Sequence, residues 1–474
     1  MRTQVSSRKT TILLICCMSL FIVGLDVTAV NVALPSIARD LDAGVSGLQW
    51  TVDAYTVVLA SLLMLSGSIA DRFGRKRVFI LGLSVFSTAS LLCSVAPTIE
   101  ALVAFRVLQA VGGSMLNPVA MSIITNTFTD PRERAQAVGI WGAGFGISMA
   151  LGPILGGALV TVVDWRSIFW INIPVGLAAI ALTLRFVPES RAPQPRRFDP
   201  VGQVLMIVLL ATLTFAIIEA PGLGWTSPVI VAAFAAAAGA LLGLLRYEPR
   251  RREPLLDLRF FRSIPFAGSI VISVSAFAAF GGFLFLNTLY LQQERGLSPV
   301  EAGFATVPLA AMMVVVSPLS GRIVGRRGPR LPLAIAGACL VVACVMLTGL
   351  GTDTPFALLV VAYVIFGIGF GFVNAPITNA AVSGMPRAQA GVAAATATTS
   401  RQVGLALGVA IAGAIVTSHL AGPATISSAS HPAWWTLAAF GVVVLVLGFA
   451  ATSRHATASA QRTAAELNPE ALVA

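Results

Sequence analysis

The chain has 474 residues, of which 57% are hydrophobic and only 11% are charged, and its mean hydropathy is +0.88. Soluble proteins carry about 25% charged residues, so this composition excludes a soluble globular protein and indicates an integral membrane protein. The net charge of +11 would suit a nucleic-acid partner, but the positions of the basic residues argue against one.

Fourteen apolar segments are long enough to cross a membrane, since a transmembrane helix needs about 20 predominantly apolar residues. They lie near residues 11–33, 50–70, 78–96, 100–124, 136–160, 166–187, 200–219, 228–247, 266–291, 301–321, 331–350, 355–380, 400–418 and 432–452. The first is too long for the apolar region of a signal peptide and no small-x-small cleavage site ends it, so we expect an uncleaved span. The sequence predicts an all-α integral membrane protein with 14 transmembrane helices.

The basic residues gather on one side of the predicted spans. With the N-terminus inside, 26 of the 31 lysines and arginines fall in cytoplasmic segments, three fall outside and two fall within spans. This positive-inside pattern predicts that both termini are cytoplasmic. It distributes the positive charge along one membrane face, which argues against a nucleic-acid partner. Only two of the basic residues are lysines, which favours a high-GC bacterium and its cell (plasma or inner) membrane.

Three short motifs recur in the same order. The segment "GSIADRFGRKR" from Gly67 is echoed by "GRIVGRRGPR" from Gly321 at an offset of 254, "RAQA" recurs at an offset of 253, and "GGSMLNP" resembles "GFGFVNAP" at an offset of 257. Duplicated helical halves around a central site are the layout of many secondary transporters. We therefore predict a cytoplasmic N-terminus (1–10), an N-terminal six-helix bundle (11–187), a linker with two extra transmembrane helices (188–265), a C-terminal six-helix bundle (266–452) and a cytoplasmic tail (453–474).

Asp26 is the only formal charge between residues 16 and 35 of the first span, where an ionised aspartate costs roughly 2.5–3.5 kcal/mol. Arg106 in the fourth span lies at a similar depth, roughly 10 Å below the outer surface at 1.5 Å per residue, so contact is possible. Burial favours a protonated carboxyl group and a nearby guanidinium favours the ionised form. We hypothesise that Asp26 carries an exchanged proton and that Arg106 modulates it. The alternative is a static ion pair that fixes the packing of spans 1 and 4.

Six motifs, in this order, resemble the major facilitator superfamily, and especially its fourteen-span branch of drug:proton antiporters, which are multidrug efflux transporters. They are "GLDVTAVNVALP", "GSIADRFGRKR", "RVLQAVGGSMLNP", "GISMALGPILGG", "YLQQERGLSPVEAG" and "SRQVGLALG". The resemblance covers about residues 10–455. It implies the major facilitator fold and export of small molecules coupled to protons.

The resemblance implies a gating latch in the loop between spans 2 and 3. Its residues are Gly67, Asp71, Arg72, Gly74, Arg75 and Lys76. Asp71 and Arg72 would bridge neighbouring helices in one state of the cycle, whereas the simpler interpretation is a basic loop that fixes helix orientation. The second repeat has Gly325 in place of Asp71, so we expect asymmetric gating.

The fifth span carries a ridge of small residues that resembles the antiporter motif. Its members are Ser148, Gly152, Pro153, Gly156 and Gly157. Such ridges let helices approach closely, and Pro153 loosens the backbone locally. The resemblance implies a flexible packing surface associated with export, and ordinary close packing is the alternative. Ser148 stands where the family usually has glycine.

Four polar residues within spans are candidates for a substrate cavity: Asn31, Asn117, Asn374 and Arg401. For each asparagine, a hydrogen bond between helices is an equal alternative, and Arg401 near the inner end of its span could snorkel to the surface. Asp53 and Glu219 lie near outer span ends, where we expect solvated helix termini in preference to substrate contacts.

The sequence thus predicts a proton-coupled efflux antiporter of amphipathic or cationic drugs and antibiotics. The cysteines and histidines have no metal-ligand spacing and there is no P-loop, so we expect no enzyme, no metal site, no ATP and no cofactor besides H⁺ as the coupling ion. The expected partners are small-molecule drugs and the lipid bilayer, and we expect a monomer. Three alternatives remain open: a dedicated exporter of one self-made antibiotic or metabolite, a metabolite:H⁺ symporter on the same fold, and a membrane receptor that transports nothing.

Overall fold

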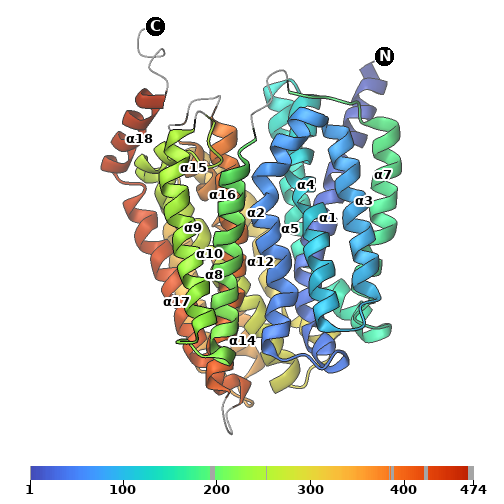
Figure 1. Cartoon of the computed structure of the whole chain (residues 1–474), viewed down its shortest axis with the longest axis vertical. Coiled ribbons are helices and arrows are strands. Elements are labelled where there is room, and N and C mark those ends of the chain that lie inside the picture. Colours follow the sequence, from blue (N-terminus) through green and yellow to red (C-terminus); the bar gives the residue numbers. More distant parts are fainter. Residues whose placement is uncertain are drawn as a thin grey trace. The chain divides into compact units, whose positions relative to one another are not determined.

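The computed structural model describes residues 2–192, 198–251, 253–383, 385, 389–420 and 425–467. Over these residues the chain forms helices and no strand (Figure 1). Fourteen helical segments are long and apolar enough to cross a membrane, which confirms the predicted class and number of spans. Four arginines of the predicted charge pattern lie outside the described residues: Arg196, Arg197, Arg252 and Arg387.

The chain divides into two compact units. Unit 1 comprises Met1–Pro200 and Gly296–Phe304, and unit 2 comprises Val201–Arg295 and Ala305–Ala474. The helices of the first 200 residues are α1 (Arg2–Asp40), α2 (Val45–Phe73), α3 (Arg75–Ser94), α4 (Ile99–Thr127), α5 (Pro131–Val162), α6 (Ser167–Trp170) and α7 (Asn172–Phe186). The later helices are α8 (Pro200–Leu223), α9 (Pro228–Tyr247), η1 (Glu248–Arg250), η2 (Leu258–Arg262), α10 (Ile264–Leu289), η3 (Tyr290–Glu294), α11 (Pro299–Ala305), α12 (Val307–Arg327), α13 (Arg330–Leu347), α14 (Phe356–Gly371), α15 (Asn374–Val382), α16 (Ala390–His419), α17 (Ile426–Ala450) and α18 (Arg454–Leu467).

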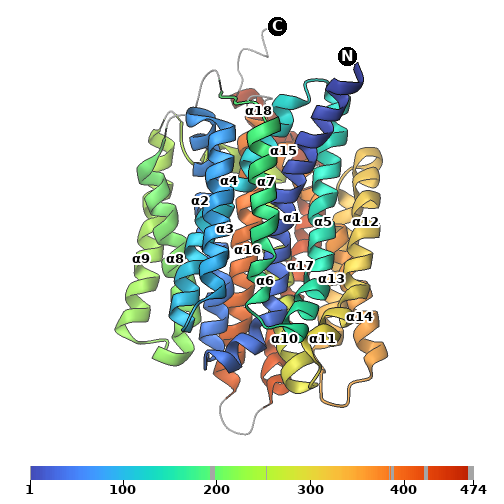
Figure 2. The ribbon, with the colours of Figure 1, turned by 90° about the vertical axis from the view of Figure 1, so that its right-hand side faces the viewer.

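The two units repeat one packing pattern. In unit 1, α1 packs against α5, α2 against α4, and α3 against both α4 and α7 (Figure 2). In unit 2 the corresponding pairs are α10 with α16, α12 with α14, and α13 with both α14 and α17. Shifting the bounds of α2 by 254 residues gives 299–327, which is the range from the start of α11 to the end of α12. The internal architecture therefore supports the duplication that the three sequence echoes indicate.

Several helix ends follow from local sequence. Asp130 precedes Pro131 at the start of α5, and its carboxylate accepts hydrogen bonds from the backbone N–H groups of Arg132 (2.9 Å) and Glu133 (3.0 Å). An N-cap aspartate followed by proline is a strong helix start, because the cap satisfies donors that have no partner within the helix. Gly74 ends α2 with φ at +117°, and Gly328 ends α12 with φ at +77°, both in the region that favours glycine.

The helices are longer than the predicted apolar runs at several ends. α1 continues through Pro35 to Asp40, and α16 begins at Ala390, ten residues before the predicted start of its span. Hydrophobicity marks only the part of a helix that lies in hydrocarbon, so a helix that projects further is underestimated from sequence.

Two elements of unit 2 lie outside the repeated pattern. α8 and α9 pack against each other through a small apolar cluster that includes Ala216, Ala220 and Ile230. The predicted tail contains a helix, α18, that packs against α10 and η2. Ser459 Oγ on α18 accepts a hydrogen bond from the Ile264 N–H at the start of α10 (3.0 Å), so α18 helps to cap that helix.

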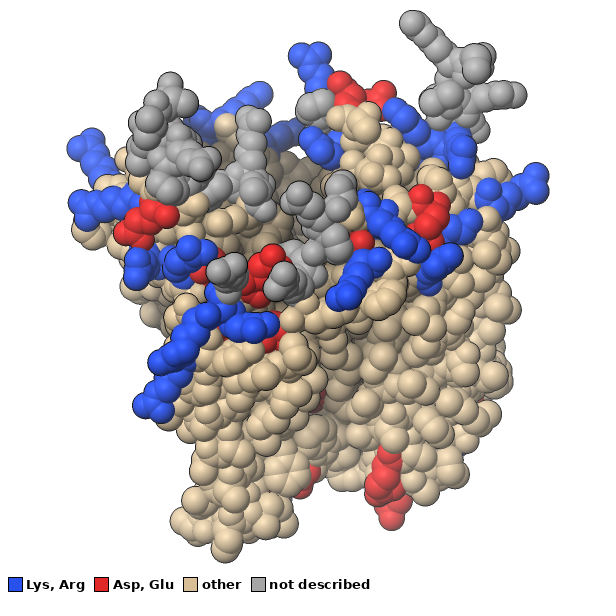
Figure 3. Space-filling model, turned by 45° about the horizontal axis from the view of Figure 1, so that its top comes forward, with Lys and Arg blue, Asp and Glu red and all other residues tan. Residues whose placement is uncertain are grey.

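Lys and Arg side chains gather over helix ends on the face shown uppermost in Figure 3, and uncharged residues form most of the lateral surface. An uncharged lateral surface suits a helix bundle that contacts lipid, because the hydrocarbon core disfavours charge.

Candidate functional site

The buried centre of unit 1 holds an ion pair between α1 and α4. Arg106 Nη1 donates to Asp26 Oδ2 at 2.5 Å, and each side chain is only 1% exposed. The contact that equal depth made possible is therefore formed. α1 runs fourteen residues beyond Asp26 to Asp40, seven more than the predicted apolar run. The α1 helix thus extends further outward than the start of α4.

Polar side chains from α3, α4 and α7 complete the surroundings of Asp26. Gln109 Nε2 donates to Asp26 Oδ1 at 2.9 Å and to Ser90 Oγ at 2.8 Å. Asn172 Nδ2 donates to Asp26 Oδ1 at 3.4 Å. Gln109 Oε1 in turn accepts from Arg106 Nη1 at 2.6 Å. Both carboxylate oxygens therefore have donors, and Gln109 contacts both members of the ion pair.

Arg106 is also held by α2. Its Nε donates to the Thr51 carbonyl oxygen at 3.0 Å, and its Cζ lies 4.3 Å from the centre of the Tyr55 ring. A guanidinium that stacks on a ring keeps its N–H edge free for a carboxylate, which is the arrangement that favours a strong pair. We name the set Asp26, Ser90, Arg106, Gln109 and Asn172 the buried charge cluster.

The sequence analysis found the ion pair but not its polar neighbours. Gln109 lies three residues after Arg106 on α4, so helical spacing alone places both on one face. Ser90 and Asn172 are ordinary polar residues in apolar spans, and their sequence positions carry no signal that they meet at Asp26. Only the packing of α3 and α7 brings them there.

Asp53 on α2 was expected at a solvated helix end, and this expectation was wrong. The residue is fully buried, at 0% exposure. Its Oδ1 accepts a hydrogen bond from Thr56 Oγ1 at 3.3 Å, and its Oδ2 has no hydrogen-bond partner among the described residues. α2 begins at Val45, eight residues earlier, so Asp53 lies two helical turns inside. Glu219 on α8 is half-buried.

The predicted gating loop between α2 and α3 is tied to the segment after α7. Asp71 accepts from Arg75 Nε (3.1 Å) and Nη2 (2.9 Å), so this ion pair joins the end of α2 to the start of α3. The link to α7 comes from Lys76, whose Nζ donates to the Leu184 carbonyl oxygen at 2.8 Å and whose N–H donates to Glu189 Oε1 at 3.0 Å.

Arg72 and the backbone extend this link. The Arg72 Cζ lies 5.1 Å from the centre of the Phe198 ring. Arg75 N–H donates to the Ser190 carbonyl oxygen at 2.9 Å, and Ala192 N–H donates to the Asp71 carbonyl oxygen at 3.0 Å. The predicted gating loop thus contacts residues 189–192 and Phe198, which the motif alone does not reveal. Gly67 lies on α2 beside Pro118 of α4.

The small-residue ridge of α5 is packed on two sides. A Cβ on Gly152 would lie 1.8 Å from Thr28 Oγ1, and one on Gly156 would lie 2.8 Å from the Ala29 Cβ, both on α1. A Cβ on Gly157 would lie 2.4 Å from the Pro299 carbonyl oxygen at the start of α11. Close packing is therefore observed at this ridge, and its role in export remains a prediction.

Pro153 and Ser148 of the same ridge are also closely packed. A Cβ on Gly303 of α11 would lie 2.3 Å from the Pro153 carbonyl oxygen, so Pro153 faces α11. Ser148 is fully buried. Both helices that touch α5 here do so at backbone distance, which requires the absence of side chains.

The three candidate asparagines have different surroundings. Asn31 Nδ2 donates to the Val27 carbonyl oxygen of its own helix at 2.7 Å, and its Oδ1 has no partner among the described residues. Asn117 on α4 is half-buried with an unpartnered Oδ1. Asn374 begins α15 in unit 2 and is half-buried. Arg401 lies well inside α16 rather than near a span end, because the helix starts at Ala390.

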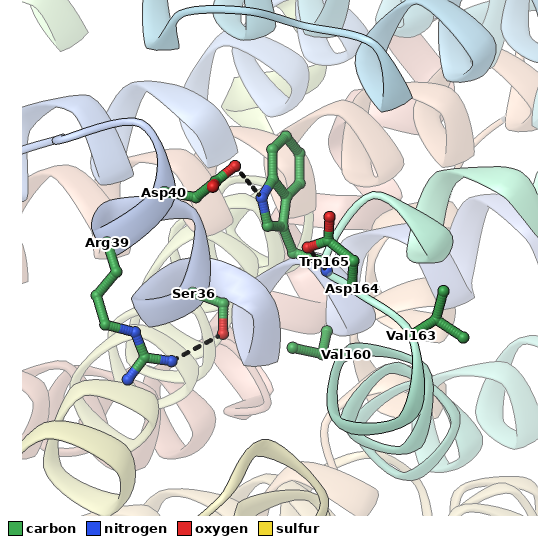
Figure 4. A pocket seen from close by; sticks show the side chains of 7 residues that line it. All are labelled: Ser36, Arg39, Asp40, Val160, Val163, Asp164 and Trp165. Carbon is green, nitrogen blue, oxygen red and sulfur yellow. Dashed lines mark hydrogen bonds between the residues drawn. The ribbon is translucent and has the colours of Figure 1, made fainter.

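A surface depression of about 350 Å³ lies where α1 ends beside the turn after α5 (Figure 4). Asp40 accepts from Trp165 Nε1 at 2.9 Å and from Arg166 Nη1 at 2.7 Å, and Arg166 also pairs with Asp164 at 3.0 Å. These contacts fasten the end of α1 to the turn that follows α5. Arg39 lines the same depression and donates to Ser36 Oγ at 3.2 Å.

Fourteen spanning helices, a duplicated internal pattern and a buried charge cluster define a multi-pass membrane transporter. The sequence matches the family model of the Major Facilitator Superfamily over residues 16–409. The chain belongs to that superfamily.

Its relatives include drug-resistance proteins. It is 37% identical over 404 residues to the multidrug resistance protein Stp of Mycobacterium tuberculosis (strain CDC 1551 / Oshkosh), a match that covers 85% of this chain and 75% of the relative. It is 36% identical over 410 residues to the tetracenomycin C resistance and export protein of Streptomyces glaucescens, covering 86% and 76%. A crystal structure of a POT family transporter in complex with 5-aminolevulinic acid has a TM-score of 0.69 at 14% identity, covering 93% and 96%. At that identity the likeness shows the fold alone.

Proposed function

We propose that this chain exports amphipathic or cationic drugs in exchange for protons. The buried charge cluster carries the proposal, because an ionisable pair inside a membrane-spanning bundle is a functional-site hypothesis by default. The relatives named as drug-resistance and export proteins support the direction and the substrate class. H⁺ is the proposed coupling ion, with no ATP and no other cofactor, acting in a monomer in the cell membrane.

In the proposed cycle, Asp26 alternates between two hydrogen-bonded states. In the first state, its carboxylate accepts hydrogen bonds from Arg106, Gln109 and Asn172. Protonation would weaken the pair, because a neutral carboxyl group loses the charge-assisted part of the hydrogen bond. Arg106 would then be released toward the Thr51 carbonyl oxygen and the Tyr55 ring. Because the cluster joins α1, α3, α4 and α7, the proton would change how these helices are held together.

Ethidium efflux from proteoliposomes under an imposed proton gradient tests this proposal. We expect Asp26→Asn to lose at least about tenfold in gradient-driven efflux while ethidium binding persists, since asparagine keeps the shape but carries no proton. Asp353→Asn is the matched control, because Asp353 lies in an exposed loop between α13 and α14.

Undiminished gradient-driven efflux by Asp26→Asn would contradict Asp26 as the coupling residue and leave a packing role. Movement of ethidium with the protons, from the acidic to the alkaline side, would favour a symporter. The tetracenomycin C exporter among the relatives is the observation that favours a dedicated antibiotic exporter. That function predicts efflux of one antibiotic class and no competition by ethidium.

A further inference from the structure

Arg401 is a cation deep within unit 2. Eleven residues, or roughly 16 Å at 1.5 Å per residue, separate it from the start of α16 at Ala390. The side chain is partly exposed, and its Nε atom is buried.

The contacts of Arg401 are all to neutral groups. Its Cζ lies 6.0 Å from the centre of the Phe277 ring on α10, and its Nη2 donates to Thr378 Oγ1 on α15 at 2.6 Å. Thr378 donates onward to the Asn374 carbonyl oxygen at 3.1 Å, which fixes the hydroxyl. The Nε atom has no hydrogen-bond partner among the described residues. A guanidinium placed over a ring in this way presents its N–H edge to a planar anion.

The helices of unit 2 that correspond to those of unit 1, α10 and α12 to α17, contain no aspartate or glutamate among the described residues. From Ile264 to Ala450 the sequence contains only three acidic residues, Glu294, Glu301 and Asp353. Glu294 lies in the turn that ends the first of these helices, Glu301 belongs to unit 1, and Asp353 is in an exposed loop. None of the ion pairs between described residues includes Arg401. A cation within a candidate membrane span is costly when it has no ion pair among the described residues, so an anion that binds it is favoured.

We propose that Arg401 is an anion-recognition residue that binds the carboxylate of amphipathic aromatic substrates. This inference rests on the proposed export function and adds a substrate class to it. The guanidinium provides paired N–H donors for a carboxylate, Thr378 holds one Nη group in position, and the buried Phe277 ring supports the guanidinium plane from below. Cationic substrates that also bear a carboxylate are then recognised better than their esters.

Rhodamine B and its ethyl ester test this inference. The two dyes share one cationic aromatic core and differ only in the free carboxylate. In phosphatidylcholine proteoliposomes, we expect Arg401→Gln to raise the half-saturating concentration for rhodamine B about tenfold and to leave that for the ester within about twofold. Arg401→Lys, which keeps the charge but not the planar fork, should fall between wild type and Arg401→Gln for rhodamine B.

Arg295→Gln is the matched control. Arg295 is another arginine of unit 2 that lies over a ring, 6.0 Å from the centre of Tyr290, and its Nη1 donates to the Thr354 carbonyl oxygen at 2.6 Å. It should change neither dye selectively. If Arg401→Gln does not fold, the selective loss is read from Arg401→Lys, and equal effects of that variant on both dyes overturn the proposal.

The remaining outcomes separate this inference from the proposed function. If wild type extrudes both dyes and every Arg401 variant treats them alike, anion recognition is wrong and export stands. If wild type extrudes neither dye nor ethidium, the export function itself fails. A defect common to both dyes that appears only when phosphatidylglycerol is added assigns the guanidinium to a lipid phosphate and also overturns the proposal.

Discussion

Asp26 and Asp53 are buried aspartates of the same unit with opposite surroundings. Asp26 has a guanidinium and two amide groups as donors, so its negative charge is fully compensated. Asp53 has one hydroxyl donor at 3.3 Å and one oxygen without a partner. Removing one member of a buried ion pair leaves the other without its partner, whereas Asp53→Asn keeps an oxygen that can accept from Thr56 Oγ1. The two residues should therefore respond differently to substitution by asparagine.

Stability measurements on asparagine variants check this contrast. We expect Asp26→Asn to lower the free energy of unfolding by about 3–5 kcal/mol, because Arg106 is left buried without its partner. Asp53→Asn should change it by less than about 1 kcal/mol. The double variant Asp26→Asn with Arg106→Gln should recover part of the first loss, as a double-mutant cycle in detergent would show. Additive losses would mean that the ion pair contributes little to folding.

The close crossing of α1 and α5 lies near Asp26 of the buried charge cluster. Gly152 and Gly156 leave no room for a side chain against Thr28 and Ala29. Because Thr28 is only two residues from Asp26 on α1, the position of the crossing also sets the position of the carboxylate. The ridge thus acts on the proposed coupling residue through backbone placement and not through direct contact.

Alanine substitutions along α5 separate this packing from general helix effects. Gly152→Ala and Gly156→Ala should each lower the free energy of unfolding by about 1–3 kcal/mol through overpacking and should reduce ethidium efflux. Gly139→Ala and Gly142→Ala on the same helix are the controls, since a Cβ at either position meets nothing within 4 Å. Those two should be neutral or slightly stabilising. Equal behaviour of all four variants in thermal unfolding would contradict a packing role for the ridge.

The two repeats have corresponding helices, but their interiors contain different kinds of side chain. At the offset of 254, Asp26 of unit 1 corresponds to Phe280 of unit 2. Phe280 stacks on Phe370 with ring centres 4.2 Å apart, and Phe283 stacks on Phe366 at 4.4 Å. Unit 2 thus holds an aromatic core where unit 1 holds its charge cluster. Corresponding helices with different interiors agree with the proposal that the proton-binding residue lies in unit 1.

The glycines that end α2 and α12 also have different surroundings in the two repeats. Gly74 and Gly328 both have positive φ, but a Cβ on Gly74 would also lie 2.7 Å from Glu189 Oε1, whereas a Cβ on Gly328 meets nothing within 4 Å. Gly328→Ala should cost about 1 kcal/mol from backbone strain alone. Gly74→Ala should cost more and should also weaken the contacts of the loop with Glu189. A Gly328→Ala loss equal to or larger than that of Gly74→Ala in thermal unfolding would refute this ranking.

Sequence reasoning predicted the number of spans and a duplication, and it left the Asp26–Arg106 contact as a possibility, because each leaves a local signal: hydrophobic length, repeated loop motifs and isolated charges. It missed what depends on packing. The sequence does not distinguish Glu189 from other acidic residues near predicted span ends. Only the folded chain shows that its carboxylate lies beside Gly74. Asp53 looked like a terminal residue because helix ends are not visible in hydrophobicity. The α18 helix was missed because it contains few large apolar residues, and its docking depends on Ser459 and Glu466 contacts.

The segment Gly296–Phe304 belongs to unit 1 although it comes from the second repeat. Its helix α11 meets α5 at backbone distance through Gly157 and Gly303. If the gene were divided within the linker, the first polypeptide would lack Gly296–Phe304, which pack within unit 1. The ancestral halves have become interdependent parts, and co-expressed fragments should assemble only when the second fragment supplies these nine residues.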